Sequence, residues 1–207
     1  MQLFKFLRCG AMAIAMCAAS SSTKANEIAL DFTGGSGQYF PGYSVGWTFS
    51  LSAPFTVGNL GWYDAGLDGF LESHSVGIFT NAGALLTSTT VVSSDELVGK
   101  FRYAAITPFV LAPGNYVIAG TSGEDLFQAF STSVTTAVGI TFNQGRFIGT
   151  GNNTLTFPTA PSDRGIAYFG PNFSSPGAAV AVPDAGSTLG MLGVAFSALA
   201  SFGLRRH

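Results

Sequence analysis

The sequence predicts an all-β fold, a β-sandwich or jelly-roll-like domain over residues 26–176. Apolar and polar residues alternate over residues 44–51 and again over 134–142, which is the two-residue period of a half-buried strand. Charged residues make up only 10% of the chain, whereas glycine and phenylalanine number 27 and 19, and this composition favours strands and turns over helices. No stretch of this region long enough for a helix shows amphipathic helical spacing.

About eight to ten short strands are expected, a number typical of sandwiches. In chain order they are predicted at residues 28–32, 44–51, 56–63, 75–80, 85–92, 101–106, 116–121, 134–142, 147–149 and 165–169. Turn signals separate several of them, at residues 81–83, 112–115 and 151–153, and residues 171–176 are expected to form a loop. The large aromatic residues are expected in the core rather than on a sugar-stacking platform: Trp47, Phe49, Trp62 and Tyr116.

The first 25 residues have the pattern of a secretory signal peptide. Lys5 and Arg8 precede a short apolar stretch at residues 9–19, and small polar residues follow it. Cleavage is expected after Ala19 or Ala25, with Ala25 preferred. Both cysteines of the chain lie in this leader, so we expect the mature domain to contain no disulfide.

Residues 177–207 are expected to form a linker and a membrane-targeting tail. A motif at residues 182–188 precedes an uncharged apolar stretch at 189–204, and Arg205-Arg206-His207 follows. The apolar stretch has about the minimum length of a spanning helix, and the basic residues place its end on the cytoplasmic side. We therefore expect a short transmembrane sorting helix.

This tail resembles the PEP-CTERM sorting signals, which are recognised by exosortases. The motif residues Val182, Pro183, Asp184, Ala185 and Gly186 are closest to the variant named for Val-Pro-Asp-Ser-Gly, with Ala185 in place of serine. The resemblance implies a Gram-negative cell envelope and a producer of extracellular polysaccharide. It also implies processing by signal peptidase and exosortase, with transient anchoring in the inner membrane before the tail is removed.

A second resemblance covers residues 61–118. The segments Gly61-Trp62-Tyr63-Asp64, Ser73-His74-Ser75-Val76-Gly77-Ile78 and Leu111-Ala112-Pro113-Gly114 are similar to an uncharacterised β-sandwich domain that recurs among PEP-CTERM proteins. This resemblance supports the predicted fold, and no known activity comes with it.

The charge of the region between the two ends argues against nucleic acid and anionic lipid as partners. Ten acidic and four basic side chains lie between residues 26 and 183, a formal charge of −6, and no basic run is present. Contact with a membrane is therefore expected only through the C-terminal helix before processing.

No catalytic set stands out in the same region. His74 is its single histidine, and a lone histidine at the start of a strand is more often a hydrogen-bonded structural residue than a catalytic base. The region lacks a Gly-x-Ser-x-Gly elbow and a phosphate-binding loop. Glycoside hydrolysis needs two facing carboxylates, which a sequence alone cannot pair across strands. We expect a protein without enzymatic activity and without a cofactor.

One acidic segment fits a metal-binding pattern in part. Asp64, Asp68 and Glu72 occupy the first, fifth and ninth places of an EF-hand-like count, with Gly69 at the sixth. The third and twelfth places lack an acid, and the segment joins two strands rather than two helices. A calcium ion and a simple Asp-Gly turn both remain open explanations of this segment.

Two classes of function follow. The first is an exported envelope or matrix protein, without enzymatic activity, that associates with extracellular polysaccharide or contributes to adhesion. The second is a carbohydrate-binding module or carbohydrate-active enzyme on the same scaffold. Exposed aromatic side chains on a concave face, with a facing pair of carboxylates, would favour the second class.

Overall fold

The computed structural model describes residues 26–131, 133–162 and 167–177, and within them the fold is all-β without helices. Fourteen strands are present in these residues: β1 (Leu30–Thr33), β2 (Ser36–Gln38), β3 (Tyr43–Leu51), β4 (Phe55–Tyr63), β5 (His74–Thr80), β6 (Leu85–Val91), β7 (Glu96–Val98), β8 (Phe101–Leu111), β9 (Gly114–Thr121), β10 (Phe127–Ala129), β11 (Ser133–Thr136), β12 (Ile140–Gly149), β13 (Ala160–Pro161) and β14 (Pro171–Ser174). The predicted all-β class is confirmed.

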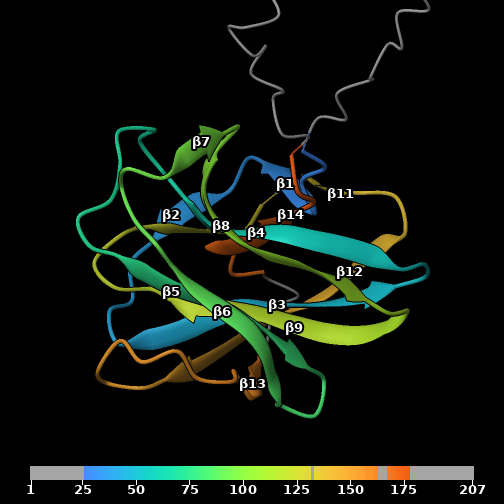
Figure 1. Ribbon diagram of the computed structural model, residues 1–207. Coiled ribbons are helices and arrows are strands. Elements are labelled where there is room, and N and C mark those ends of the chain that lie inside the picture. Colours follow the sequence, from blue (N-terminus) through green and yellow to red (C-terminus); the bar gives the residue numbers. More distant parts are fainter. Residues whose placement is uncertain (1–25, 132, 163–166, 178–207) are drawn as a thin grey trace, which may run out of the picture.

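Two larger sheets form the two layers of the domain (Figure 1). One has six strands in the order β13-β12-β3-β9-β5-β6, and the other has four in the order β14-β4-β8-β7. Two small ribbons, β1–β11 and β10–β2, complete the described part of the fold. All pairings are antiparallel, and the arrangement is consistent with the predicted β-sandwich.

Aromatic side chains fill the space between the sheets. Trp47 and Phe49 of β3 are fully buried and pack on Phe173 of β14, with ring centroids 5.9 and 4.9 Å apart. Trp62 of β4 is also fully buried, and Tyr116 lies partly buried against the same cluster. The predicted role of these aromatic residues in the core is therefore confirmed.

The three predicted turns separate strands as expected. Residues 81–83 connect β5 to β6, residues 112–115 span the β8–β9 junction, and residues 151–153 follow β12. Gly83 and Gly151 have positive φ values of 93° and 72°, which glycine adopts without a steric penalty.

The expected single strand at residues 134–142 is in fact two. Gly139, with φ of 82°, breaks the chain direction, so that β11 pairs with β1 and β12 pairs with β3. The alternating pattern is continuous in the sequence because both strands have one apolar face. The two faces, however, belong to different sheets.

The prediction of a loop at residues 171–176 is also wrong for its first four residues. Pro171–Ser174 form β14, all four residues are buried, and the strand pairs with β4. Pro171 is tolerated because β14 is an edge strand of its sheet, so the missing backbone N–H interrupts no ladder. Burial of Phe173 among the core aromatic rings supplies the driving force.

Part of the predicted strand at 165–169 lies outside the described residues. Within it, Phe169 makes an isolated antiparallel bridge to Gln128. The short strands β2, β7, β10 and β13 were not predicted, because two or three residues carry no usable periodicity.

The signal peptide, the sorting motif and the apolar helix predicted at 189–204 lie outside the described residues. Among the residues that the structure does describe, none belongs to a helix long and apolar enough to cross a membrane.

Candidate functional site

His74 occupies a structural position at the junction of both sheets. Its ring is fully buried and stacks on Trp62, with centroids 4.3 Å apart and planes 9° from parallel. Nδ1 donates to the carbonyl oxygen of Thr121 at 2.8 Å, and Nε2 lies 3.1 Å from Oδ2 of Asp125, an ion pair whenever the imidazole is protonated. The same carboxylate accepts the backbone N–H groups of Leu71 and Glu72.

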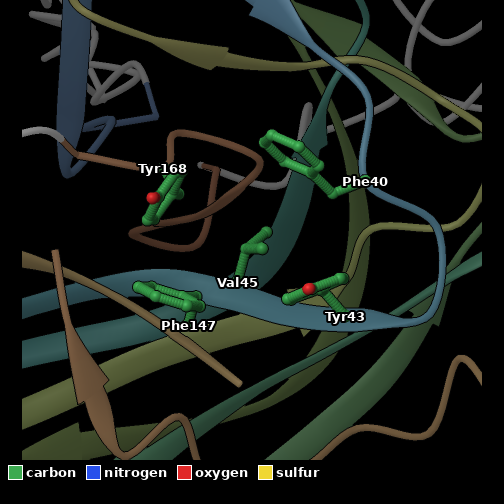
Figure 2. Close-up of a pocket in the computed structure, with 5 residues that line it drawn as sticks. All are labelled: Phe40, Tyr43, Val45, Phe147 and Tyr168. Atoms are coloured by element: carbon green, nitrogen blue, oxygen red, sulfur yellow. The ribbon is translucent and has the colours of Figure 1, made fainter. Parts of the chain in front are cut away.

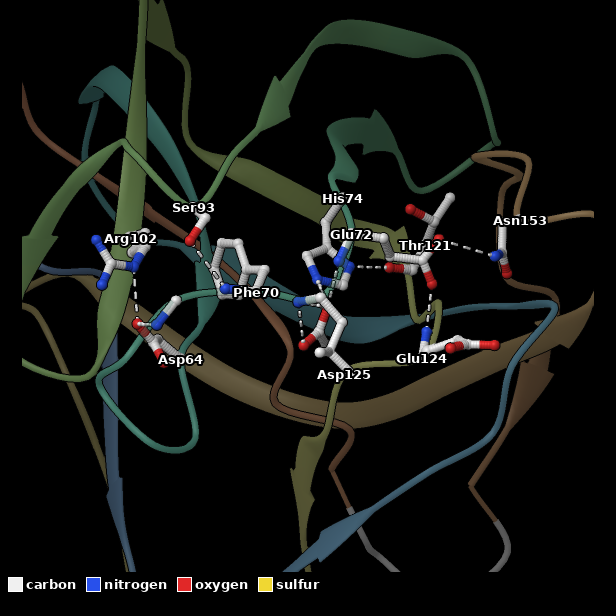
Figure 3. Close-up of polar contacts among 12 residues, drawn as sticks. Asp64, Phe70, Glu72, His74, Ser93, Arg102, Thr121, Glu124, Asp125 and Asn153 are labelled. Carbon is white, nitrogen blue, oxygen red and sulfur yellow. Dashed lines mark hydrogen bonds and ion pairs between the residues drawn. The ribbon is translucent and has the colours of Figure 1, made fainter.

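This arrangement connects two loops, as Figure 3 shows. His74 begins β5, and Asp125 lies in the connection between β9 and β10. Glu72 reaches the same connection, because its Oε1 accepts the backbone N–H of Glu124. The cluster thus fixes the β4–β5 loop to the β9–β10 loop, so its role is structural.

The pKa of His74 lies below its ordinary value of 6.5. Burial is the main cause, because it disfavours the charged imidazolium. The hydrogen bond to the Thr121 carbonyl and the charge of Asp125 act in the opposite direction and reduce the shift. The folded protein therefore favours neutral His74 more strongly than the unfolded chain does.

The three carboxylates of the acidic segment after β4 have different surroundings. Oδ2 of the buried Asp64 accepts the backbone N–H of Gly69 at 3.0 Å and pairs with Nε of Arg102 at 2.7 Å. Asp68 is exposed, and Glu72 is directed to Glu124 instead. In the described parts of the chain, no group of three histidine, cysteine, aspartate or glutamate side chains could hold a metal ion. The structure does not bring Asp64, Asp68 and Glu72 together as one set of ligands.

The candidate binding site lies elsewhere, on the outer face of the six-stranded sheet. A groove of about 550 Å³ runs along β5 and β6, beside the chain that follows β12. That volume is within the range of ligand sites. The described lining residues carry no charge: Ser75, Leu85, Ser88, Thr89, Thr90, Asn153, Thr154 and Leu155.

Strand register places the hydroxyl groups of the groove together. Ser75 pairs with Thr90 and Gly77 with Ser88 across the β5–β6 ladder, so the four residues share one face of the sheet. Within the described residues, the side-chain hydroxyls of Ser75, Ser88 and Thr90 have no hydrogen-bond partner in the protein. They are therefore available to a ligand as both donors and acceptors.

Apolar packing and hydrogen bonds anchor the wall of the groove. Leu155 packs with Phe79, Val117 and Ala119 in a small apolar cluster on this outer face. Asn153 accepts the backbone N–H of Gly42 through Oδ1 at 2.8 Å. A side chain at Gly77 would approach Leu155 to 2.9 Å, so the absence of a side chain there keeps the wall in place.

Sequence reasoning missed these groove residues. The run Thr87-Ser88-Thr89-Thr90 on a predicted strand was the available signal, because small hydroxyl side chains on an exposed strand face leave room for a ligand. The partners Asp125 of His74 and Arg102 of Asp64 had no sequence signal, since 51 and 38 residues separate each pair.

The stability of the folded protein should depend on the ionisation of His74. Because the folded state lowers its pKa, the unfolded chain binds more protons below pH 6.5, and the free energy of unfolding falls as the pH falls below that value. The slope contributed by His74 is at most about 1.4 kcal/mol per pH unit. Urea unfolding of wild type and of His74→Phe between pH 7.5 and about 5.5 measures this slope. The variant should be less stable at neutral pH but lose less on acidification; equal slopes would contradict the assignment.

The acidic segment yields a separate expectation about calcium. The melting temperature should be the same in millimolar calcium and in chelator, because Oδ2 of Asp64 already pairs with Arg102 and Gly69, and Glu72 is directed to Glu124. Asp68→Ala should lower the free energy of unfolding by about 1 kcal/mol or less. A calcium-dependent rise in melting temperature that disappears in Asp68→Ala would show a metal site.

Comparison with known proteins identifies the tail of the chain. Residues 181–206 match the VPDSG-CTERM motif, which contains the predicted Val182-Pro183-Asp184 sequence. No curated protein matches the chain, and no solved structure matches it. The chain therefore carries a PEP-CTERM-like C-terminal sorting tail, the signal of an exported, sorted protein.

Proposed function

We propose that this protein is a non-enzymatic component of the cell surface or extracellular matrix whose β domain binds a neutral extracellular polysaccharide along the β5–β6 groove. The sorting tail supports delivery to the surface. The observation that carries the binding proposal is the uncharged, hydroxyl-lined groove. Sugar hydroxyl groups both donate and accept hydrogen bonds, as do the serine and threonine side chains that face them.

The chemistry of the groove favours binding over hydrolysis. Hydrolysis of a glycosidic bond requires two carboxyl groups on either side of the bond, and none of the described groove residues has a carboxyl group. The groove also lies beside β6, the last strand of its sheet in the described residues, so a long chain could extend past that edge. A carbohydrate-binding module is thus the form of the carbohydrate hypothesis that this geometry supports.

Processing completes the proposal. Signal peptidase removes the leader through Ala19 or Ala25, and an exosortase of a Gram-negative envelope recognises Val182–Gly186. The apolar stretch at 189–204 then serves as a transient inner-membrane anchor before the tail is lost. The contribution of the mature domain is adhesion or cohesion of the matrix through its polysaccharide contact.

Binding can be tested by replacing hydroxyl groups in the groove. The double variant Ser88→Ala/Thr90→Val should bind the neutral polysaccharide of the host at least about tenfold more weakly, because it lacks two hydroxyl groups that can form hydrogen bonds with the sugar. Thr56→Val on the other sheet replaces an exposed threonine away from the groove and serves as the matched control. Isothermal titration calorimetry gives the affinities; equal affinity of all three proteins would refute binding along the groove.

Processing can be tested in the host by intact-mass analysis of the envelope form. The expected mass lacks the leader and the residues beyond about Val182, whereas Pro183→Ala/Asp184→Ala should retain the tail. Recovery of the full chain of 207 residues from the cytoplasm would contradict export.

A further inference from the structure

Four aromatic residues line a second hollow: Phe40, Tyr43, Phe147 and Tyr168. The fully buried Phe127 contacts Phe40 and Tyr168 and so completes a closed ring of five aromatic side chains. In order around the ring they are Phe40, Tyr43, Phe147, Tyr168 and Phe127, and each contacts the next with centroids 5.5–6.4 Å apart. The hollow has a volume of about 120 Å³, with Val45 among its lining residues. Figure 2 shows Tyr43 and Phe147 beside Val45 on the sheet, with Phe40 and Tyr168 across from them.

Hydrogen bonds hold the backbone on the Phe40 side of the ring, although Phe40 itself is 45% exposed. Ser122 donates its hydroxyl hydrogen to the carbonyl oxygen of Phe40, and its backbone N–H bonds to the carbonyl oxygen of Tyr43. Gly42, between them, accepts the backbone N–H groups of Thr150 and Gly151 at 2.7 and 2.9 Å. These hydrogen bonds place Phe40 over the hollow in the absence of a ligand.

The other side of the ring is fixed by the isolated bridge between Gln128 and Phe169. Its two backbone hydrogen bonds, of 3.1 and 2.8 Å, set the positions of the neighbouring residues Phe127 and Tyr168. A ring assembled this way is preorganised, so a ligand loses little free energy to ordering of the protein.

The shape of the ring indicates a compact ligand. Neighbouring rings are inclined to one another by 37–81°, so they surround a small volume rather than forming a flat platform. A pyranose stacks its flat face on a platform, whereas a tetrahedral group is enclosed equally well from several sides. The volume also falls below the range for a complete drug-sized ligand and suits a single small group.

The electrostatics indicate a cation. Aromatic faces carry negative partial charge and attract ammonium groups within about 6 Å of the ring centre, and cages of such rings bind quaternary ammonium. No charged side chain is among the described lining residues. Lys100, Arg102 and Arg146, the cations of the described residues, are engaged elsewhere with Asp31, Asp64 and the Thr159 carbonyl.

We propose that the hollow lined by Phe40, Tyr43, Phe147 and Tyr168 binds a methylated ammonium group through cation–π contacts. The ligand class comprises choline and betaine derivatives, whether soluble, attached to a polymer or carried by a lipid headgroup. This site is distinct from the β5–β6 groove, and it stands or falls independently of polysaccharide binding.

The test compares tetramethylammonium and choline with 3,3-dimethylbutan-1-ol, the neutral isostere of choline. NMR titration of the full-length chain, purified without ammonium-bearing detergent, follows the resonances of the five aromatic residues. We expect choline to bind at least tenfold more tightly than the neutral isostere, since the two have the same shape. Equal affinity for choline and its neutral isostere would show that the hollow is only an apolar cavity. Shifts produced by neutral oligosaccharides but not by tetramethylammonium would show that it binds sugar. Either result overturns the proposal.

Variants separate the site from the fold. Phe40→Leu keeps an apolar side chain but removes one ring face, and should weaken choline binding at least fivefold; Phe40→Trp should preserve or strengthen it, because tryptophan has the most favourable ring for cations. Tyr39→Leu is the matched control, since Tyr39 is 49% exposed and lies outside the hollow. Loss of binding in Tyr39→Leu equal to that in Phe40→Leu would contradict the assignment.

Vesicles of phosphatidylcholine and of phosphatidylglycerol identify the source of the group. Phe40-dependent binding to phosphatidylcholine vesicles alone would identify the ligand as a lipid headgroup. Binding of free choline without either vesicle assigns a soluble or polymer-attached ligand, and Phe40-independent binding to both vesicle types, with no choline shifts, overturns the site.

Discussion

The positions of the β4–β5 and β9–β10 loops depend on the stacking of Trp62 on His74. Trp62 belongs to the four-stranded sheet and His74 to the six-stranded sheet, so this one ring pair joins the two layers. Phe70 closes it from the side with an edge contact at 4.9 Å. Since both ring nitrogens of His74 meet fixed partners, the position of the stack sets the positions of the loops around it.

Glycines make room for this stack, which explains part of the unusual composition. A side chain at Gly120 or Gly170 would approach the Trp62 ring to 2.7 or 2.4 Å. Close approach of backbone to a large aromatic ring is possible only where no Cβ intervenes. Gly120 and Gly170 therefore allow the backbone to pack directly against the Trp62 ring.

Alternation and composition were enough to predict the all-β class and the longer strands. Contacts between residues far apart in the chain could not be predicted from the sequence. Strand β3 was recognisable because its apolar residues repeat every second position from Val45 to Leu51. β14 was misassigned because Pro171 indicates a loop when its edge position is unknown. The sorting motif was predictable because it is a contiguous string, whereas the groove and the aromatic ring assemble from segments that only the fold brings together.

A single connection, the chain that follows β12, organises both proposed binding sites. Its Thr150 and Gly151 bond the Gly42 carbonyl and so position Phe40 at the aromatic ring. Two residues later, Asn153 bonds the Gly42 N–H while lining the hydroxyl groove on the opposite face of the sheet. Leu155 then fixes the same connection to the sheet by burying itself against Val117 and Ala119. Because this segment is the shared support, a change at Gly42 or Asn153 alters both surfaces, whereas Ser88 and Phe40 each belong to one of them.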